Sequence, residues 1–274
     1  MPQAGPHPAD PTGGAHRLAT LRRPRVAQPG DDRDLPPAVP GRCARRAARP
    51  LVRSGAVSCV VVFGREPVPG RVKTRLAAGV GEELAAAIYR ELLGHTLGVA
   101  GSIDADVVLA LADPPARGWR PERAVAVEVQ VAGDLGRRLA DAFARRFAEG
   151  YRRVVVVGSD CPELAPRHLR AAFDGLARHP VVLGPAWDGG YWLVGARAPG
   201  VDLFSDIPWS TGQVLEATRA RLRAVAAGWL ELERLHDLDT DADLRRALDG
   251  ETIGGELRSR LQATARSIGR ACAP

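Results

Sequence analysis

Short β-branched runs alternate with longer segments of helical period from residue 57 onward, and this alternation constrains the fold more than any other feature of the chain. The clearest strand is the valine run Val154–Val157. Val57–Phe63 is a second continuous apolar run, as expected for a strand that helices cover on both faces. Gly81–Leu97 instead has apolar residues three and four apart, which indicates a helix. The pattern predicts an α/β fold with a mostly parallel, twisted sheet and helices on both faces.

The same patterns place the remaining elements. Strands are expected at Asp106–Leu111, Val125–Val131, Val181–Leu183, Tyr191–Val194 and Trp229–Leu232, and helices at Asp134–Phe147, Arg167–Leu176, Thr211–Ala224 and Asp241–Leu248. N-caps are expected at Asp134, at Ser210 or Thr211, and at Thr240 or Asp241. Polar loops follow four of the strands, at residues 65–75, 158–162, 184–190 and 236–241. Because ligands bind at the carboxyl ends of strands in such sheets, we expect these loops to form one site.

Residues 1–56 differ from the rest of the chain in composition. They contain ten arginines and four aspartates, so they carry the whole formal net charge of +6. The segment is rich in proline and has no apolar period, which predicts disorder, and we interpret it as an extension upstream of the true start. It has no aromatic residue for base stacking, so we expect no nucleic-acid partner despite the positive charge.

Residues 57–250 are predicted to form one folded domain, and residues 251–274 a C-terminal tail. No apolar core of signal-peptide length follows Met1, and no stretch approaches the length of a membrane-spanning helix. The four cysteines are widely spaced and form no CxxC pair, which is typical of reduced thiols. We therefore expect a cytoplasmic protein without a membrane partner.

Lys73 is the only lysine of the chain, and it lies in a loop that two prolines and a glycine constrain. Arg71, Lys73 and Arg75 place three cations within five positions. A compact ammonium group suits a point contact with phosphate, whereas a guanidinium suits planar bidentate recognition. The alternative is chance, since a chain poor in lysine must keep its last one somewhere. We favour an exposed phosphate-binding loop that includes Pro69, Gly70, Lys73 and Arg75, with Lys73 also catalytic.

Acidic residues follow two of the strands. Asp160 could cap the next helix, but the helix start near Pro166 puts it too early for that role. We interpret Asp160, Asp237 and Asp239 as ligands of a Mg²⁺ or Mn²⁺ ion, because hard divalent cations bind one or two carboxylates together with substrate phosphates. His236 is expected to be structural, since such ions take oxygen ligands.

Residues 184–192 combine paired glycines with an acid and aromatic rings. Asp-Gly is a strong hairpin signal, so the structural interpretation is a turn. A tight turn can also present a carboxylate and backbone amides to an acceptor molecule. We therefore predict an acceptor pocket of Asp188, Gly189, Gly190, Tyr191 and Trp209, with Asp188 catalytic.

The run of residues 133–138 opens a helix whose N-terminus suits an anion or a base edge. Arg137 is the candidate nucleotide-binding residue here, and the alternative is a solvated surface arginine. The chain contains no Walker loop, no dinucleotide-binding GxGxxG and no GxSxG elbow. With no nucleophile evident, direct in-line displacement on a metal-bound nucleotide remains.

Six motifs in this order resemble a bacterial glycosyltransferase-like family with a GT-A-type fold. Its members are known as arsenosugar-biosynthesis glycosyltransferases or radical-SAM-associated transferases. The family is also distantly similar to the 2-phospholactate and molybdenum-cofactor guanylyltransferases. The motifs are PVPGRVKTRL at 67–76, GDLGRRL at 133–139, GSDCPEL at 158–164, GPAWDGGYWLVG at 184–195, WST at 209–211 and DLDTDADL at 237–244.

The resemblance implies that residues 57–250 form a GT-A-like, nucleotide-dependent transferase domain. It assigns Lys73 and Arg75 to phosphate contacts and Asp160 to the metal. Trp187 departs from the smaller or acidic residue usual in the family, so the resemblance does not identify the acceptor. The first hypothesis is a glycosyltransferase that uses a nucleotide-sugar, a small-molecule acceptor and Mg²⁺ or Mn²⁺. A guanylyltransferase-like nucleotidyltransferase is the second hypothesis, and a non-catalytic nucleotide-binding protein is the third.

Overall fold

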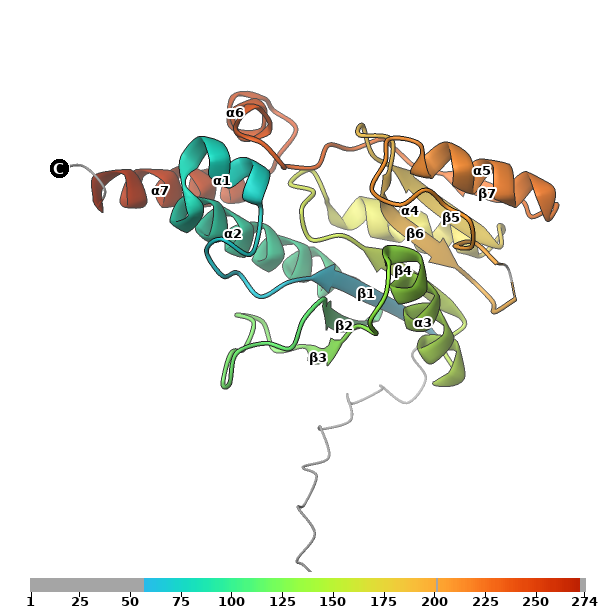
Figure 1. Ribbon diagram of the computed structural model, residues 1–274. Coiled ribbons are helices and arrows are strands. Elements are labelled where there is room, and N and C mark those ends of the chain that lie inside the picture. Colours follow the sequence, from blue (N-terminus) through green and yellow to red (C-terminus); the bar gives the residue numbers. More distant parts are fainter. Residues whose placement is uncertain (1–56, 201, 272–274) are drawn as a thin grey trace, which may run out of the picture. The chain divides into compact units, whose positions relative to one another are not determined.

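A seven-stranded sheet runs through the part of the chain that the structure describes, residues 57–200 and 202–271 (Figure 1). The structure is a computed structural model, and the expectations for residues 1–56 lie outside the described residues. The strands are β1 (Ser58–Gly64), β2 (Asp106–Leu111), β3 (Ala126–Val129), β4 (Arg153–Val157), β5 (Val181–Pro185), β6 (Tyr191–Ala196) and β7 (Trp229–Glu231). Their order is β3-β2-β1-β4-β6-β5-β7, with β6 antiparallel to β4 and β5 and the other pairs parallel. The predicted α/β fold with a mostly parallel sheet is confirmed.

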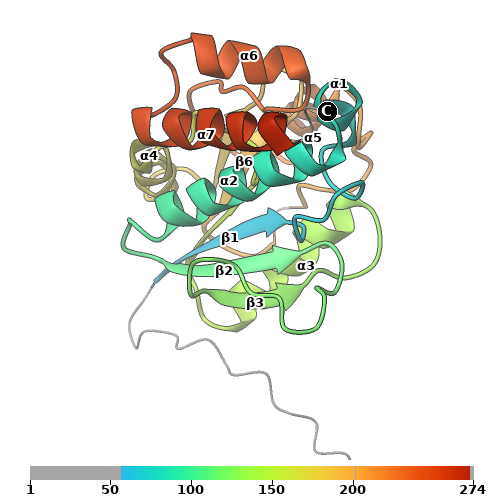
Figure 2. The ribbon, with the colours of Figure 1, turned by 90° about the vertical axis from the view of Figure 1, so that its left-hand side faces the viewer.

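Helices cover both faces of the sheet. They are α1 (Thr74–Val80), α2 (Glu82–Ala100), α3 (Leu135–Ala148), α4 (Pro166–Leu176), α5 (Val214–Ala224), α6 (Asp241–Asp249) and α7 (Gly255–Ala271). Side chains of α2 and α4 pack on one face, and those of α3 and α5 on the other. Figure 2 shows α2 and α3 on opposite sides of β1, β2 and β3. No helix in the described ranges is long and apolar enough to cross a membrane.

Burial on both faces explains the continuous apolar runs of β1 and β4. Val60 and Val62 pack beneath α2 and α4, whereas Val61 points to the side of α3 and α5. The parallel register pairs Val60 with Val155 and Val62 with Val157, so each layer of valines continues across the two strands. All five side chains are fully buried, and the carboxyl ends of β1 and β4 are thereby held next to each other.

Two of the predicted helix caps are confirmed. The Asp134 side chain accepts a hydrogen bond from the Arg137 N–H at 2.8 Å and starts α3. The Thr240 hydroxyl accepts from the Asp243 N–H at 3.2 Å and starts α6. Each cap satisfies a backbone N–H that the first turn of a helix leaves unpaired.

The predicted cap of α5 at Ser210 or Thr211 is wrong. α5 begins at Val214, after Gln213. The Thr211 hydroxyl accepts from the Gln213 N–H at 3.2 Å and donates to the Pro208 carbonyl at 2.7 Å, so it closes a local turn instead. Short hydroxyl side chains favour such turns as readily as caps, and the sequence does not separate the two.

A second layer of helices packs outside α2, and the sequence predicted little of it. α1 begins at the end of the expected loop 65–75 and continues to Val80, where no helix was predicted, and α7 lies within the segment expected to be a C-terminal tail. Leu257 and Leu261 of α7 are buried with Leu76 of α1 and Leu92 of α2. The domain boundary expected at residue 250 is therefore too early, because the outer face of α2 is apolar and α7 covers it.

We expect Leu261→Ala to destabilise the domain by about 2–5 kcal/mol, because it removes fully buried side-chain volume from the contact between α7 and α2. Urea unfolding measures the change. Arg266→Ala on the exposed face of α7 is the control and should stay within about 0.5 kcal/mol of the wild type. Equal stability of Leu261→Ala and the wild type would mean that α7 adds nothing to the core.

Candidate functional site

A pocket of about 670 Å³ opens at the edge of the sheet where the parallel strands end. Its walls come from the segments that follow β1, β2, β3 and β4, from the start of β6, and from residues 237–239. Three of the four predicted loops, 65–75, 158–162 and 236–241, contribute directly. The carboxyl ends of neighbouring parallel strands converge at one edge, and this is why segments far apart in the sequence share the pocket.

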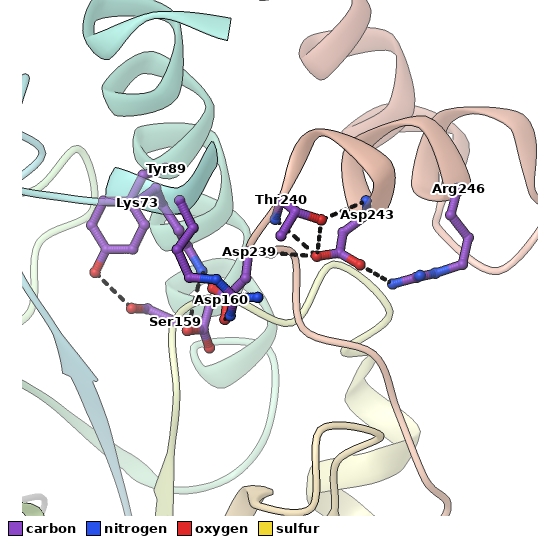
Figure 3. A network of polar contacts seen from close by, with 9 residues as sticks. Lys73, Tyr89, Ser159, Asp160, Asp239, Thr240, Asp243 and Arg246 are labelled. Carbon is purple, nitrogen blue, oxygen red and sulfur yellow. Dashed lines mark hydrogen bonds and ion pairs between the residues drawn. The ribbon is translucent and has the colours of Figure 1, made fainter. Parts of the chain in front are cut away.

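Lys73 lies between two carboxylates in this pocket (Figure 3). Its Nζ is 2.6 Å from Asp239 Oδ1 and 3.2 Å from Asp160 Oδ2, and only 6% of its side chain is exposed. The loop is exposed at Arg71 and Arg75, as expected, but the Lys73 side chain is not. Burial alone would lower the pKa of Lys73, but the charges of Asp160 and Asp239 outweigh it and raise that pKa above its ordinary value. Lys73 thus stays charged at physiological pH.

The backbone of Lys73 is in the left-handed region, with φ of 46°, which is uncommon for a residue other than glycine. Lys73 is the N-cap residue of α1, and the Ala77 N–H donates to its carbonyl at 2.8 Å. Fully buried Leu76 anchors the helix that follows. The start of α1 therefore holds Lys73 in a conformation that turns its side chain toward the acids.

Asp160 and Asp239 are held by contacts between their own loops. The Leu238 N–H donates to the Asp160 carbonyl at 2.9 Å, which ties the segment after β4 to residues 237–239. Asp243 Oδ2 accepts from the N–H groups of Asp239 and Thr240, at 3.1 and 2.8 Å. Because α4 begins at Pro166 with Ala165 as its cap residue, Asp160 does not serve as a helix cap. The cap of α6 instead fixes the backbone that carries Asp239.

Asp237 lies deeper than the other two acids. Its Oδ1 is buried and has no hydrogen-bond partner among the described residues. Burial raises the pKa of Asp237 well above its ordinary value, and the charges of Asp160 and Asp188 raise it further, although Lys73 opposes them. A buried carboxylate oxygen without a donor is suited to a cation.

The three predicted metal ligands share the pocket but do not form a ready-made metal centre. Within the described ranges, no group of three or more His, Cys, Asp or Glu side chains is arranged to hold a metal ion. Lys73 separates Asp160 from Asp239 by binding both. Their oxygen donors, together with the unpaired oxygen of Asp237, fit a hard divalent cation in chemistry.

A buried tyrosine that the sequence did not single out joins the two central loops. Tyr89 of α2 accepts a hydrogen bond from the backbone N–H of Arg65 at 2.9 Å. Its hydroxyl is also 2.7 Å from the Ser159 hydroxyl, as Figure 3 shows. Arg65 follows β1 and Ser159 follows β4. Tyr89 thus fixes the floor of the pocket between the two strand ends. A single tyrosine on a helical apolar face gives no sequence signal for this role.

The predicted acceptor residues form a turn at one side of the pocket. Gly189 has φ of 91°, and a Cβ there would lie 2.1 Å from the Gly212 carbonyl oxygen, so only glycine fits. Asp188 is exposed and accepts from the Gly190 N–H at 2.8 Å. The hairpin interpretation is confirmed, because the turn joins antiparallel β5 and β6. Of the predicted acceptor residues, only Tyr191 lines the pocket itself.

Trp209 does not line the pocket but contacts Tyr191, which does. It packs edge-on against Tyr191, with ring centroids 6.4 Å apart. A Cβ on Gly136 would lie 2.5 Å from Trp209 Nε1, so the glycine lets the indole approach the start of α3 closely. Trp209 therefore links the start of α3 to the start of β6.

Of the residues predicted to bind a nucleotide, the structure brings some into the pocket and leaves others outside. Lys73 and Arg75 line it, whereas Pro69, Gly70 and Arg137 do not. Arg138, one residue beyond Arg137, lines the pocket together with Gln130 and Leu135. The sequence signal that could have found Arg138 is its helical spacing of three from Leu135, which puts both side chains on one face.

His236 is structural, as expected. The backbone N–H of His236 donates to Glu163 Oε2 at 2.9 Å. The imidazole ring stacks on the indole of Trp187, with ring centroids 5.3 Å apart. The guanidinium of Arg234 lies 5.1 Å from the centroid of the same indole. Trp187 is 58% exposed between them, beside the turn that carries Asp188.

We expect Asp237→Asn to stabilise the protein at neutral pH, because burial and the neighbouring acids raise the pKa of Asp237 and oppose its ionisation. The folded state binds the proton of Asp237 more tightly than the unfolded state, in which the pKa is ordinarily 3.8. This preference contributes stability that is fully present below the unfolded pKa and is lost as the pH rises through the folded pKa. Asparagine cannot ionise, so the advantage of the variant should shrink at pH 4.5. Urea unfolding in EDTA at both pH values, with Asp174→Asn on the exposed face of α4 as the control, measures this. A pH-independent difference would refute the role of ionisation.

Comparison with known proteins places this chain in a family. A family model described as an uncharacterized protein conserved in bacteria, DUF2064, matches residues 96–211. The chain has no match among curated proteins. Among solved structures, it is similar to a proposed nucleotide-diphospho-sugar transferase from Desulfovibrio desulfuricans, with 30% identity and a TM-score of 0.70. That match covers 77% of this chain and 98% of the other.

Two further solved structures are more distant. Rv0371c from Mycobacterium tuberculosis has 21% identity and a TM-score of 0.48, and the match covers 71% of this chain and 99% of that chain. A cytidylyltransferase from Leptospira borgpetersenii has 13% identity and a TM-score of 0.45, with coverage of 79% and 95%. None of these matches distinguishes the arsenosugar-biosynthesis group suggested by the sequence motifs. On the strength of the Desulfovibrio match, the chain belongs to the same nucleotide-diphospho-sugar transferase family and is a transferase.

Proposed function

We propose that the protein is a metal-dependent glycosyltransferase, which transfers a sugar from a nucleotide-sugar donor to a small-molecule acceptor. One observation carries this proposal: a cationic loop and three carboxylates face the same pocket, at the edge of the sheet where the strands end. Phosphate groups need cations, and a divalent ion between carboxylates and phosphates supplies one of them. The relation to the Desulfovibrio protein supports a nucleotide-sugar as the donor.

Asp160, Asp237 and Asp239 are the residues that would hold Mg²⁺ or Mn²⁺. When bound, the ion would neutralise charge on the donor diphosphate as it leaves. Lys73 now pairs with Asp160 and Asp239, and Arg75 lies 3.6 Å from Asp239. A phosphate in the pocket would offer both cations an alternative anionic partner. In this proposal Lys73 turns from the carboxylates to the donor phosphates.

The turn that carries Asp188 is the proposed acceptor side. Asp188 is exposed, and it lies close enough to Asp237 to raise the pKa of that residue. A carboxylate in this position can accept the proton of an acceptor hydroxyl. The bond from the anomeric carbon to the acceptor oxygen then forms, while the bond from that carbon to the diphosphate breaks. Gly189 and Gly190 would let the acceptor approach the backbone, and Tyr191 and Trp209 would form its wall.

The alternative is a nucleotidyltransferase that joins a nucleoside triphosphate to a phosphorylated small molecule. The same cations and carboxylates would serve either reaction, and the two reactions differ in their leaving group. Incubation with nucleotide-sugars and Mg²⁺ or Mn²⁺ should release a nucleoside diphosphate in the presence of acceptor. Release of pyrophosphate from a triphosphate instead would establish the alternative, and no binding of any nucleotide would refute both.

We expect Lys73→Arg to impair turnover although the charge is kept, because a longer planar group cannot occupy the narrow space between Asp160 and Asp239. Lys73→Ala should lose roughly ten- to a hundredfold in kcat/KM, as expected for one charge-assisted contact. Steady-state kinetics with the identified donor provide the measurement. Arg152→Lys, at the opposite end of β4, is the control for an arginine-lysine exchange. Wild-type kinetics in Lys73→Arg would mean that the single lysine is an accident of composition.

Asp160→Asn should keep the fold and abolish the response of nucleotide binding to Mg²⁺, because a neutral amide is a poor ligand for a hard cation. Titration calorimetry with and without Mg²⁺ measures the response, and Mn²⁺ binding followed by electron paramagnetic resonance measures the metal directly. Unchanged Mn²⁺ affinity in Asp160→Asn would remove Asp160 from the metal site.

A further inference from the structure

The pocket continues past the acids to the ends of β2 and β3. Gln130 and Ala112, which come after the ends of these two strands, line it together with Asp160 after β4. In the sheet, β3, β2, β1 and β4 are successive neighbours. Three strand spacings make the pocket roughly 14 Å long, since neighbouring strands lie about 4.8 Å apart. A phosphate alone would not fill this length, whereas a nucleotide would place its base at the far end.

Arg138 is held at that far end by two contacts. Its Nε donates to the Gly133 carbonyl at 3.0 Å, and its Nη1 donates to Gln130 Oε1 at 3.3 Å. Gln130 is fixed in turn, because its Nε2 donates to the Ala110 carbonyl at 2.8 Å. No carboxylate pairs with Arg138 among the described residues, unlike Arg65, which pairs with Asp113. The guanidinium is therefore oriented without being neutralised.

A guanidinium has five N–H donors, and these two contacts use two of them. The donors that remain, on the adjacent nitrogens Nη1 and Nη2, match two neighbouring acceptors on a planar ligand. Guanine offers such a pair in O6 and N7, and arginine binds it in a bidentate manner. Cytosine offers one in O2 and N3. In adenine the amino group lies beside N1 and N7, and the lone pair of N3 diverges from that of N1. In uracil the N3–H donor lies between the two carbonyl oxygens, so neither base presents this pair.

Leu135 supplies a surface for the ring of the base. It is 42% exposed although it is a large apolar residue, and it lines the pocket at the start of α3. Leu135 and Arg138 are three residues apart in α3, so they project from the same side of the helix. One residue can contact the face of a base while the other contacts its edge.

We infer that Arg138, fixed by Gln130, selects the base of the nucleotide and favours guanine or cytosine over adenine and uracil. This inference rests on the proposed function, since it assumes that the pocket binds a nucleotide. It adds a specificity-determining residue and a class of base to that function. Arg137 is exposed and outside the pocket, and it is a matched control with the same charge on the same helix.

The test is titration calorimetry of GDP, CDP, ADP and UDP in Mg²⁺ with the wild type, Arg138→Ala, Arg138→Lys and Arg137→Ala. We expect the wild type to bind GDP or CDP at least about tenfold more tightly than ADP and UDP, as for one bidentate contact. Arg138→Ala and Arg138→Lys should lose this preference, because lysine keeps the charge but not the paired donors. Arg137→Ala should keep it.

The outcomes separate the inference from the proposed function. If the wild type binds the diphosphates without base preference, or prefers ADP or UDP, the inference fails and the nucleotide site stands. If Arg138→Ala keeps the wild-type preference while still binding, or if Arg137→Ala loses it, Arg138 is not the selecting residue. If none of the four diphosphates binds to the wild type, the proposed function fails and the inference fails with it.

Discussion

The ion pairs of Lys73 hold the site together in this structure. One ammonium group joins Asp160, which follows β4, to Asp239, which precedes α6. Lys73 itself belongs to the segment between β1 and α1, so three distant parts of the chain meet at one atom. The ammonium group stays charged although it is buried, because its attraction to two carboxylates outweighs the cost of removing it from water. The start of α1, the cap of α6 and the end of β4 therefore meet at this contact.

The sheet supplies the rigid frame for that contact. Valine layers of β1 and β4 fix two neighbouring strand ends, and Tyr89 joins the loops that leave them. The antiparallel strand β6 matters for a different reason. Its reversal lets a short turn connect it to β5, and this turn brings Asp188 and Tyr191 to the same edge as the parallel strand ends. Close packing of Gly189 on Gly212 holds the turn against the start of α5.

Two charged groups of the pocket, Asp237 and Arg138, lack a partner of opposite charge that fully compensates them. Asp237 is buried beside other acids and one of its oxygens lacks a partner, which raises its pKa and opposes its ionisation. Arg138, at the other end, is oriented by neutral partners alone. In the proposed function, a cation would pair with Asp237 and the base of a nucleotide would pair with Arg138. Groups left unsatisfied in a pocket are typical of a binding site.

The sequence alone determined the fold class and most elements, because strand and helix periods are local properties of the chain. It also indicated Lys73, Asp160, Asp237 and Asp239, since these residues follow strands and strand ends converge. It missed α1 and α7, whose burial depends on the outer face of α2. Only the tertiary structure decided that Lys73 is buried between two acids and that Arg138, not Arg137, faces the pocket. The burial of Lys73 depends on contacts between segments far apart in the chain, which no local pattern encodes. The helical spacing of Arg138 from Leu135 is local, but which face of α3 meets the pocket is set by the tertiary structure.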